Sequence, residues 1–428
     1  MSQQIKMLIR RIRMINPNTV FLFMLVVFLI DSGVNFFIRA PIFVPVAIVA
    51  LPILWIILWK SGRKNTFLLV FISVFLLATM INNFIYQFDK KNISDLMFIL
   101  LFPTIYYFYK LKPEKILPRS IHIFFIVSLI MLSFTFVGYN SGSWLPNDQV
   151  IKKRSEIMEV AKADKESALE TDHIPFIILE LFRTYNNGLF RVPHLANYFF
   201  GFLFLFYGFA FQKKRKWYFF IAMLVSIILM LYSGSRTFVV VALLALILFL
   251  FNRKTLGFLL ALSVIMVLMI VYRFELYMNL EGTYLEHYAS LIVTTIDNYT
   301  NLSRIKIWNS WWDEIQQFTW YDYLIGKTFI ASKSANFENI KFREWFHNDF
   351  LSIVYAYGIL PLILYSAFFY KVYKENSKFI RKNTFLFVYF FAMVFSAFFN
   401  GFYYYFPVFL IFIFVYMVRV EKKKKITL

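Results

Sequence analysis

The chain of 428 residues contains no cysteine and few charged residues. The lack of cysteine excludes disulfide bonds, thiolate metal sites and a cysteine nucleophile. Only 16% of the residues are charged, whereas 60% are hydrophobic and 21% are aromatic. A water-soluble domain cannot bury that much apolar surface, so the composition indicates a membrane protein.

Acidic residues are also scarce, with 24 Asp and Glu against 45 Lys and Arg, and the formal net charge is +21. In a soluble protein such an excess would suggest nucleic acid as a partner. Here the basic residues form short clusters between apolar runs, which is the pattern of cytoplasmic loops in membrane proteins. No nucleic-acid partner is therefore expected.

Apolar runs long enough to cross about 30 Å of hydrocarbon recur along the chain. They do not alternate between apolar and polar residues, as the strands of a transmembrane β-barrel would. We therefore predict an all-α polytopic membrane protein with about twelve transmembrane helices. The expected spans are 18–38, 41–59, 66–86, 93–109, 120–138, 193–211, 217–232, 237–252, 256–272, 349–370, 384–400 and 402–418.

Basic clusters precede the first span and follow every even-numbered one, as at Lys213 to Lys216 and at Lys422 to Lys425. The positive-inside rule then places both termini in the cytoplasm and the odd-numbered exits outside. Many Phe, Lys, Ile and Asn residues suggest an AT-rich bacterial genome. We expect a multi-pass protein of the bacterial cytoplasmic membrane.

Two long loops are predicted on the outer face, and they divide the chain into five segments. The first loop contains a charged stretch, 151–169, whose apolar spacing predicts a short amphipathic helix. The second is rich in Trp and Tyr. The segments are five N-terminal helices (1–138), the first outer loop (139–192), four helices (193–272), the second outer loop (273–346) and three C-terminal helices (347–428).

Three residues stand where predicted helices begin on the outer face. Arg191 precedes Pro193, which suits a first helical turn, and Arg236 and His347 precede two further spans. A helix N-terminus carries partial positive charge and free N–H groups, and an adjacent arginine adds to that field. Together these three would favour an anion such as phosphate. The plainer alternative is an arginine that extends to the headgroup level.

The second outer loop supplies one more cation within "NLSRIKIWNSWWDEI". Arg304 lies four residues before Trp308, so both residues can share one helix face. Gly326 follows in "YLIGK" and allows a turn. The alternative for Arg304 is a solvated loop charge.

His347 is the strongest candidate for a general base among the 5 histidines. The alternatives for it are an interfacial imidazole or a capping group, while Asn348 or Asp349 suits the cap of the following helix. The competing histidines are His173, His194 and His287. Because the histidines are scattered, without the spacing of a metal-binding motif, neither a metal nor another cofactor is expected.

Three stretches occur in an order that resembles the O-antigen ligase and Wzy-type polysaccharide polymerase superfamily. They are "YSGSRTFVVVALLALI", "SRIKIWNSWWDEI" with "YLIGK", and "HNDFLSIVYAYGILPLILY". The superfamily pattern is a Ser-Arg opening one membrane helix, an outer-loop Arg with a following Trp and Gly, and a His-Asn opening a later helix with a Gly about ten residues on. Gly358 supplies that last glycine, and the resemblance covers roughly 185–370.

The resemblance implies a metal-independent, inverting glycosyl transfer on the outer face, from a polyprenyl-diphosphate-linked sugar. Arg236 and Arg304 would bind the donor's diphosphate, and His347 would take a proton from the attacking hydroxyl. We add Arg191 to the diphosphate site because of its place at a helix start. Secondary candidates are His194, Asn197, Ser235 and Asn348.

The expected function is polymerisation of lipid-linked repeat units of a capsule, exopolysaccharide or O-antigen. The expected partners are the polyprenyl-diphosphate-linked donor and acceptor, the lipid bilayer, a chain-length regulator and a flippase. A ligase that moves finished glycan to another acceptor is the near alternative. A flippase or exporter of lipid-linked oligosaccharide, or an outer-face receptor or immunity protein without chemistry, would be a different class.

Overall fold

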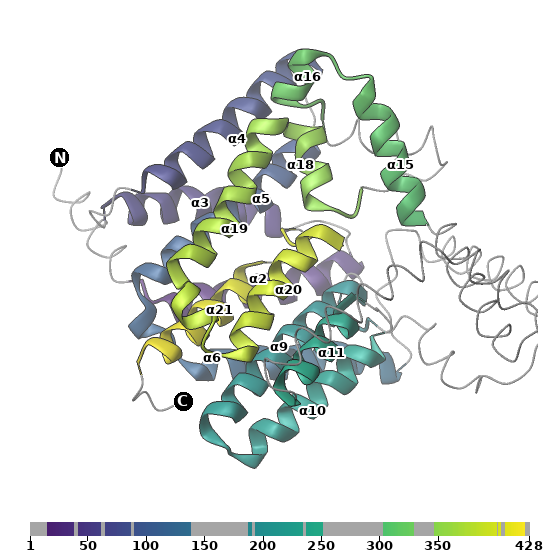
Figure 1. The fold of residues 1–428 in the computed structure, drawn as a ribbon. Helices are drawn as coiled ribbons and strands as arrows, with labels where there is room; N and C mark the ends of the chain where they lie inside the picture. The colour runs from purple at the N-terminus through teal and green to yellow at the C-terminus, as the bar shows by residue number, and fades with distance from the viewer. Residues whose placement is uncertain are drawn as a thin grey trace, which may run out of the picture.

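The computed structural model describes residues 15–37, 42–60, 65–86, 90–137, 187–190, 193–233, 237–250, 303–328, 346–399, 401–403 and 407–423. Every regular element in this described part is a helix (Figure 1). The α-helices are α2 (Pro17–Phe37), α3 (Phe43–Lys60), α4 (Thr66–Ile85), α5 (Lys90–Leu111), α6 (Pro118–Ser133), α9 (Pro193–Lys214), α10 (Trp217–Tyr232), α11 (Thr237–Leu250), α15 (Ser303–Gln316), α16 (Trp320–Ile325), α18 (Asp349–Tyr357), α19 (Ile359–Ile380), α20 (Thr384–Phe399) and α21 (Pro407–Lys422). Two short 3₁₀ helices are Pro113–Lys115 and Phe134–Val137.

Three of the described helical segments are long and apolar enough to cross a membrane: Thr66–Ile85, Pro118–Phe136 and His194–Lys214. Four shorter helices are also strongly apolar: Pro17–Ser32, Phe43–Trp59, Trp217–Tyr232 and Thr384–Phe399. An all-helical chain with such segments is suited to a membrane location, as the composition indicated.

Most predicted spans coincide with observed helices, but one is wrong as a continuous helix. The span predicted at 349–370 consists of two helices, α18 and α19, which are separated at Gly358. Gly358 has φ +90°, a value that favours glycine and interrupts the helical path. The span predicted at 256–272 and the amphipathic helix predicted at 151–169 lie outside the described residues.

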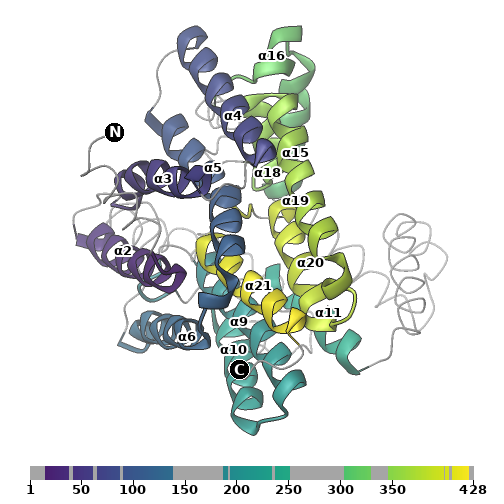
Figure 2. The same cartoon turned by 90° about the vertical axis from the view of Figure 1, so that its left-hand side faces the viewer.

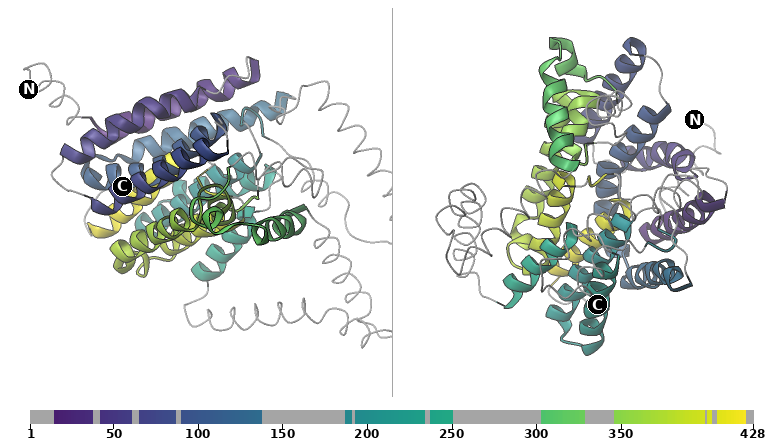
Figure 3. Two further views of the ribbon diagram at one scale, coloured as in Figure 1. Left: turned by 90° about the horizontal axis from the view of Figure 1, so that it is seen from above. Right: turned by 90° about the vertical axis from the view of Figure 1, so that its right-hand side faces the viewer.

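The helices lie side by side, with α9 and α21 in the interior. Of the spanning segment in α9, 89% is buried inside the protein, whereas the value is 39% for α4. Apolar residues of α4 such as Met80 and Phe84 point outward instead, and Phe84 is 91% exposed. Figure 2 shows α21 between α2, α3 and α6 on one side and α19 and α20 on the other, and Figure 3 shows the helices roughly parallel from above. The exposed apolar faces are suited to lipid.

One end of the helix bundle collects basic residues from distant parts of the chain, and we call it the basic end. There Lys112 Nζ donates to the carbonyl of Ile15 at 2.7 Å. Lys110 pairs with Glu375 at 2.7 Å, and Lys213 pairs with Glu421. Among the described residues, basic side chains at 110–112, 213 and 422–423, which the sequence predicts to be cytoplasmic, therefore lie at the same end of the bundle.

The opposite end is built from the far end of α4 together with α15, α16 and α18. Asn82 in α4 donates from Nδ2 to the carbonyls of Ile325 at 2.8 Å and Ala356 at 2.7 Å. One side-chain amide thus holds the ends of α16 and α18 against α4. This end carries two of the stretches quoted above, the one that contains Trp308 and Gly326 and the one that begins at His347.

Candidate functional site

His347 lies immediately before α18 and has an unusual backbone conformation. Its φ is +52°, in the left-handed region that residues other than glycine rarely adopt. Such a conformation costs about 1–3 kcal/mol and persists where surrounding contacts enforce it. The preceding residue, Phe346, is fully buried, whereas His347 is half-buried. The chain therefore makes a sharp turn at the imidazole and enters α18 two residues later.

The next residue, Asn348, is the cap of α18, as one of the two capping alternatives predicted. Its Oδ1 accepts hydrogen bonds from the backbone N–H of Phe350 at 2.9 Å and of Leu351 at 3.1 Å. This satisfies two of the otherwise unpaired N–H groups at the helix start. The side chain of Asn348 is thus committed to the fold, and the positive end of α18 lies beside His347.

Asp349 has a larger structural role than the capping alternative considered in the sequence. It is fully buried, and its Oδ2 accepts from Tyr365 Oη at 2.5 Å, from Phe402 N at 2.7 Å and from Tyr403 N at 3.3 Å. Its other oxygen has no hydrogen-bond partner among the described residues. Asp349 therefore fixes the start of α18 to α19 and to the segment before α21. A lone Asp at the edge of an apolar run was the only signal for this role.

Helix α15 packs along α18 and supports the backbone at His347. Trp308 Nε1 donates to the carbonyl of Phe346 at 3.0 Å, and Trp311 Nε1 donates to the carbonyl of Leu351 at 3.1 Å. The prediction that Arg304 and Trp308 share a helix is confirmed. Arg304 lies one turn, about 6 Å of rise, before Trp308. The side chain of Arg304 lies outside the described residues.

Gly326 and Gly358 meet where two stretches of backbone cross. A Cβ added at Gly358 would come closer than 3.0 Å to the backbone of Leu324, and one at Gly326 would come that close to the backbone of Tyr357. Between them, Lys327 N donates to the carbonyl of Tyr355 at 2.7 Å. Both glycines of the quoted motifs are therefore required by the same close approach. The predicted turn at Gly326 is confirmed, with φ +74°.

Asn197 in α9 connects α10 and α11, the helices on either side of the Ser-Gly-Ser-Arg stretch in the sequence. It is fully buried, donates from Nδ2 to the carbonyl of Met230 at 3.1 Å, and accepts at Oδ1 from Phe238 N at 3.1 Å. It therefore holds the end of α10 beside the start of α11. His194 is half-buried about one turn earlier in α9, whose start at Pro193 is confirmed. Arg191, Ser235 and Arg236 lie outside the described residues.

Aromatic contacts link the start of α11 to the start of α18. The rings of Phe238 and Phe202 have centroids 4.7 Å apart, and those of Phe202 and Phe402 are 6.4 Å apart. The backbone N–H of Phe402 then donates to Asp349. The helix start that follows Arg236 in the sequence is thus connected, through Phe202 in α9 and Phe402, to the helix start that follows His347.

A second polar contact joins the far end of α4 to α16. Tyr86 Oη donates to Asp322 Oδ1, and Asp322 Oδ2 accepts from Thr319 N at 2.9 Å and from Thr319 Oγ1 at 2.7 Å. Burial acts to raise the pKa of the Asp322 carboxyl, but the hydrogen bonds from Tyr86 and Thr319 outweigh it and hold that pKa below its usual value. Burial and the Asp322 charge raise the pKa of Tyr86, so its hydroxyl remains a donor.

Within the described residues, no group of three or more His, Cys, Asp and Glu side chains could hold a metal ion. Comparison of the chain with models of known protein families found no match, and comparison with curated proteins found none either.

Proposed function

We propose that this protein is a membrane glycosyltransferase that polymerises polyprenyl-diphosphate-linked oligosaccharide repeat units on the outer face of the bacterial cytoplasmic membrane. The observation that carries the proposal is the arrangement at His347. Trp308 and the left-handed φ of His347 hold the backbone that carries the imidazole, while Asn348 and Asp349 make the hydrogen bonds that hold the start of α18. We assign the role of acid–base group at the start of α18 to the imidazole.

In the proposed reaction, His347 takes the proton of a hydroxyl on the acceptor sugar. The hydroxyl oxygen forms a bond to the anomeric carbon of the donor sugar, and the bond from that carbon to the diphosphate oxygen breaks. The products are a lengthened glycan, which remains on the acceptor's lipid, and the donor's polyprenyl diphosphate, which is released. A positioned base contributes about 10²–10⁴-fold to the rate of such a step.

The departing diphosphate gains negative charge, and cations positioned beforehand stabilise it. We assign that role to Arg236, Arg304 and Arg191. Support for Arg304 comes from α15, whose Trp308 contacts the residue before His347. Support for Arg236 comes from the contacts that connect the start of α11, through Phe202 and Phe402, to the start of α18. No metal ion or other cofactor is needed for this chemistry.

The break between α18 and α19 favours one other candidate, a flippase for lipid-linked oligosaccharide. Transporters often place broken helices at their substrate site and move them during alternating access. Here the break is held by the crossing of Gly326 with Gly358 and by the two hydrogen bonds from Asn82. A break held on two sides fits a static reaction site better than a moving gate.

A ligase would use the same chemistry with a different acceptor.

The test is the variant His347→Asn in cells that lack the native gene. Asparagine tolerates a positive φ, so the backbone is retained while the base is removed. We expect surface polymer to disappear, with single lipid-linked repeats accumulating on the outer face. His122→Asn is the matched control, because His122 lies in α6 and contacts Tyr207, away from the site.

Membrane levels of both variants are compared with those of the wild type before the polysaccharide is examined on a gel. Normal polymer from His347→Asn would exclude His347 as the base. Loss of polymer with repeats trapped on the inner face would support the flippase instead. The ligase is tested separately with the purified wild-type protein. Polymer that forms in that assay and remains on its lipid carrier would exclude the ligase.

A further inference from the structure

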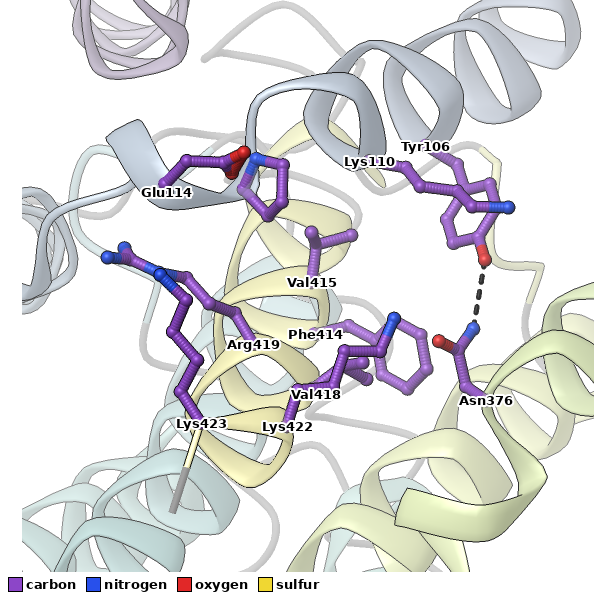
Figure 4. Close-up of a pocket in the computed structure, with 11 residues that line it drawn as sticks. Tyr106, Lys110, Glu114, Asn376, Phe414, Val415, Val418, Arg419, Lys422 and Lys423 are labelled. Atoms are coloured by element: carbon purple, nitrogen blue, oxygen red, sulfur yellow. Dashed lines mark hydrogen bonds between the residues drawn. The ribbon is translucent and has the colours of Figure 1, made fainter. Parts of the chain in front are cut away.

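A pocket opens at the basic end, lined by residues of α5, α19 and α21 and of the 3₁₀ helix Pro113–Lys115 (Figure 4). None of its lining residues belongs to the candidate site. Its empty volume is about 520 Å³ with the open mouth included. The residues that line it combine apolar side chains with several cations. They are Tyr106, Lys110, Pro113, Glu114, Asn376, Phe414, Val415, Val418, Arg419, Lys422 and Lys423.

The apolar part of the lining comes from one face of α21. Phe414, Val415 and Val418 are all at most 6% exposed. Figure 4 shows Lys110 and Lys422 on the Asn376 side of Val415, and Arg419 and Lys423 on the other side. The pocket thus has an apolar floor with cations around it, an arrangement that matches an amphiphilic anion.

The cations of this pocket exceed the carboxylates that neutralise them. Lys110 is paired with Glu375 at 2.7 Å. Lys422 instead places its Nζ over the ring of Phe379, 5.3 Å from the centroid. In the described part of the chain, Arg419, Lys422 and Lys423 form no salt bridge within 4.0 Å, although Glu114 also lines the pocket.

Arg419 supplies a buried donor that the protein itself does not use. Its Nη1 donates to the carbonyl of Ile116, which fixes the guanidinium plane. Its Nε is buried and has no hydrogen-bond partner among the described residues. A buried guanidinium N–H without an acceptor is costly, so the Arg419 side chain gains if it turns this N–H toward an anion in the pocket, and phosphate oxygens fit guanidinium geometry well.

We propose that this pocket binds an anionic phospholipid of the inner leaflet. The phosphodiester lies among Arg419, Lys422 and Lys423, and the apolar atoms that line the pocket contact the glycerol part and the first carbons of an acyl chain. The apolar floor favours a lipid over a soluble phosphate, which would gain nothing from it. The site is distinct from the proposed reaction, because it is at the opposite end of the bundle and needs none of its residues.

The experiment uses the full chain purified in a neutral detergent. Phosphatidylglycerol is titrated, with phosphatidylcholine and inorganic phosphate as separate probes, and bound lipid is counted by native mass spectrometry alongside the thermal unfolding temperature. We expect a retained phosphatidylglycerol and a higher unfolding temperature, with little effect of phosphatidylcholine.

Lys422→Gln tests the pocket, and Lys216→Gln, an exposed lysine before α10 at the same end, is the matched control. Lys422→Gln should weaken the apparent affinity for phosphatidylglycerol about fivefold, and the double variant with Lys423→Gln about twentyfold. Lys216→Gln should leave it unchanged. Equal weakening by Lys216→Gln, or equal binding of phosphatidylcholine, would overturn the proposal. A matching shift with inorganic phosphate alone would overturn the lipid assignment.

Discussion

The close approach of the backbone at Gly326 and Gly358 predicts that replacing Gly358 lowers the free energy of unfolding substantially. Alanine at position 358 must adopt φ +90° with ψ near 180°, a conformation open essentially to glycine alone, at a cost of about 1–3 kcal/mol. Its Cβ must also displace the backbone of Leu324, and overpacking of this kind costs about 1–3 kcal/mol more. We expect Gly358→Ala to lower the free energy of unfolding by about 2–6 kcal/mol.

The assay is unfolding of the purified protein in mixed micelles with increasing SDS, followed by tryptophan fluorescence. Ser366→Ala is the control, because Ser366 is exposed in the same helix and its change should stay within about 0.5 kcal/mol. Unfolding of Gly358→Ala within 0.5 kcal/mol of the wild type would refute the argument.

A double-mutant cycle adds a second condition to this prediction. Gly326→Ala acts on the same crossing, so either alanine alone should force the two stretches of backbone apart. Once they are apart, the second substitution costs less. The double variant should therefore be more stable than the sum of the single losses implies, by about 0.5–3 kcal/mol. Strict additivity would show that the two glycines do not share one constraint.

Three further predictions concern single side chains. Asn197→Leu leaves the N–H of Phe238 without its acceptor, while the carbonyl of Met230 keeps its hydrogen bond from Ser233 Oγ, and should cost about 1–3 kcal/mol in the same unfolding assay; an unchanged stability would contradict the bridging role of Asn197. Trp308→Phe removes the donor to Phe346 and should slow polymer formation about fivefold without loss of fold, whereas Trp311→Phe should slow it less; equal effects would contradict a role in positioning His347. Because the Asp322 pKa is depressed in the folded state, its stabilisation is present above the unfolded value of about 3.9 and is lost as the pH falls through the folded pKa. The stability difference between wild type and Asp322→Asn should therefore shrink below about pH 4, with exposed Asp313→Asn as control, and a constant difference would contradict the assignment.

Local sequence patterns were sufficient for most of the helices. Apolar runs predicted the spans because each helix satisfies its own backbone and needs only an apolar surface of the right length. The helix start at Pro193, the cap at Asn348 and the turn at Gly326 were predictable for the same reason. Each depends on hydrogen bonds or dihedral angles within a few residues.

Only the tertiary structure determined which distant residues contact these locally predicted helices, caps and turns. The break at Gly358 depends on α16, which crosses it after a separation of about thirty residues in the chain, and no apolar pattern records that crossing. Asp349 finds its partners at Tyr365, Phe402 and Tyr403, and Asn197 joins two helices that only packing brings together. The sequence by itself determined an all-helical chain with apolar segments long enough to cross a membrane, and it indicated which residues stand at several helix starts. The contacts that hold these helix starts in place, and the cationic pocket at the basic end, depend on long-range packing that periodicity and composition do not encode.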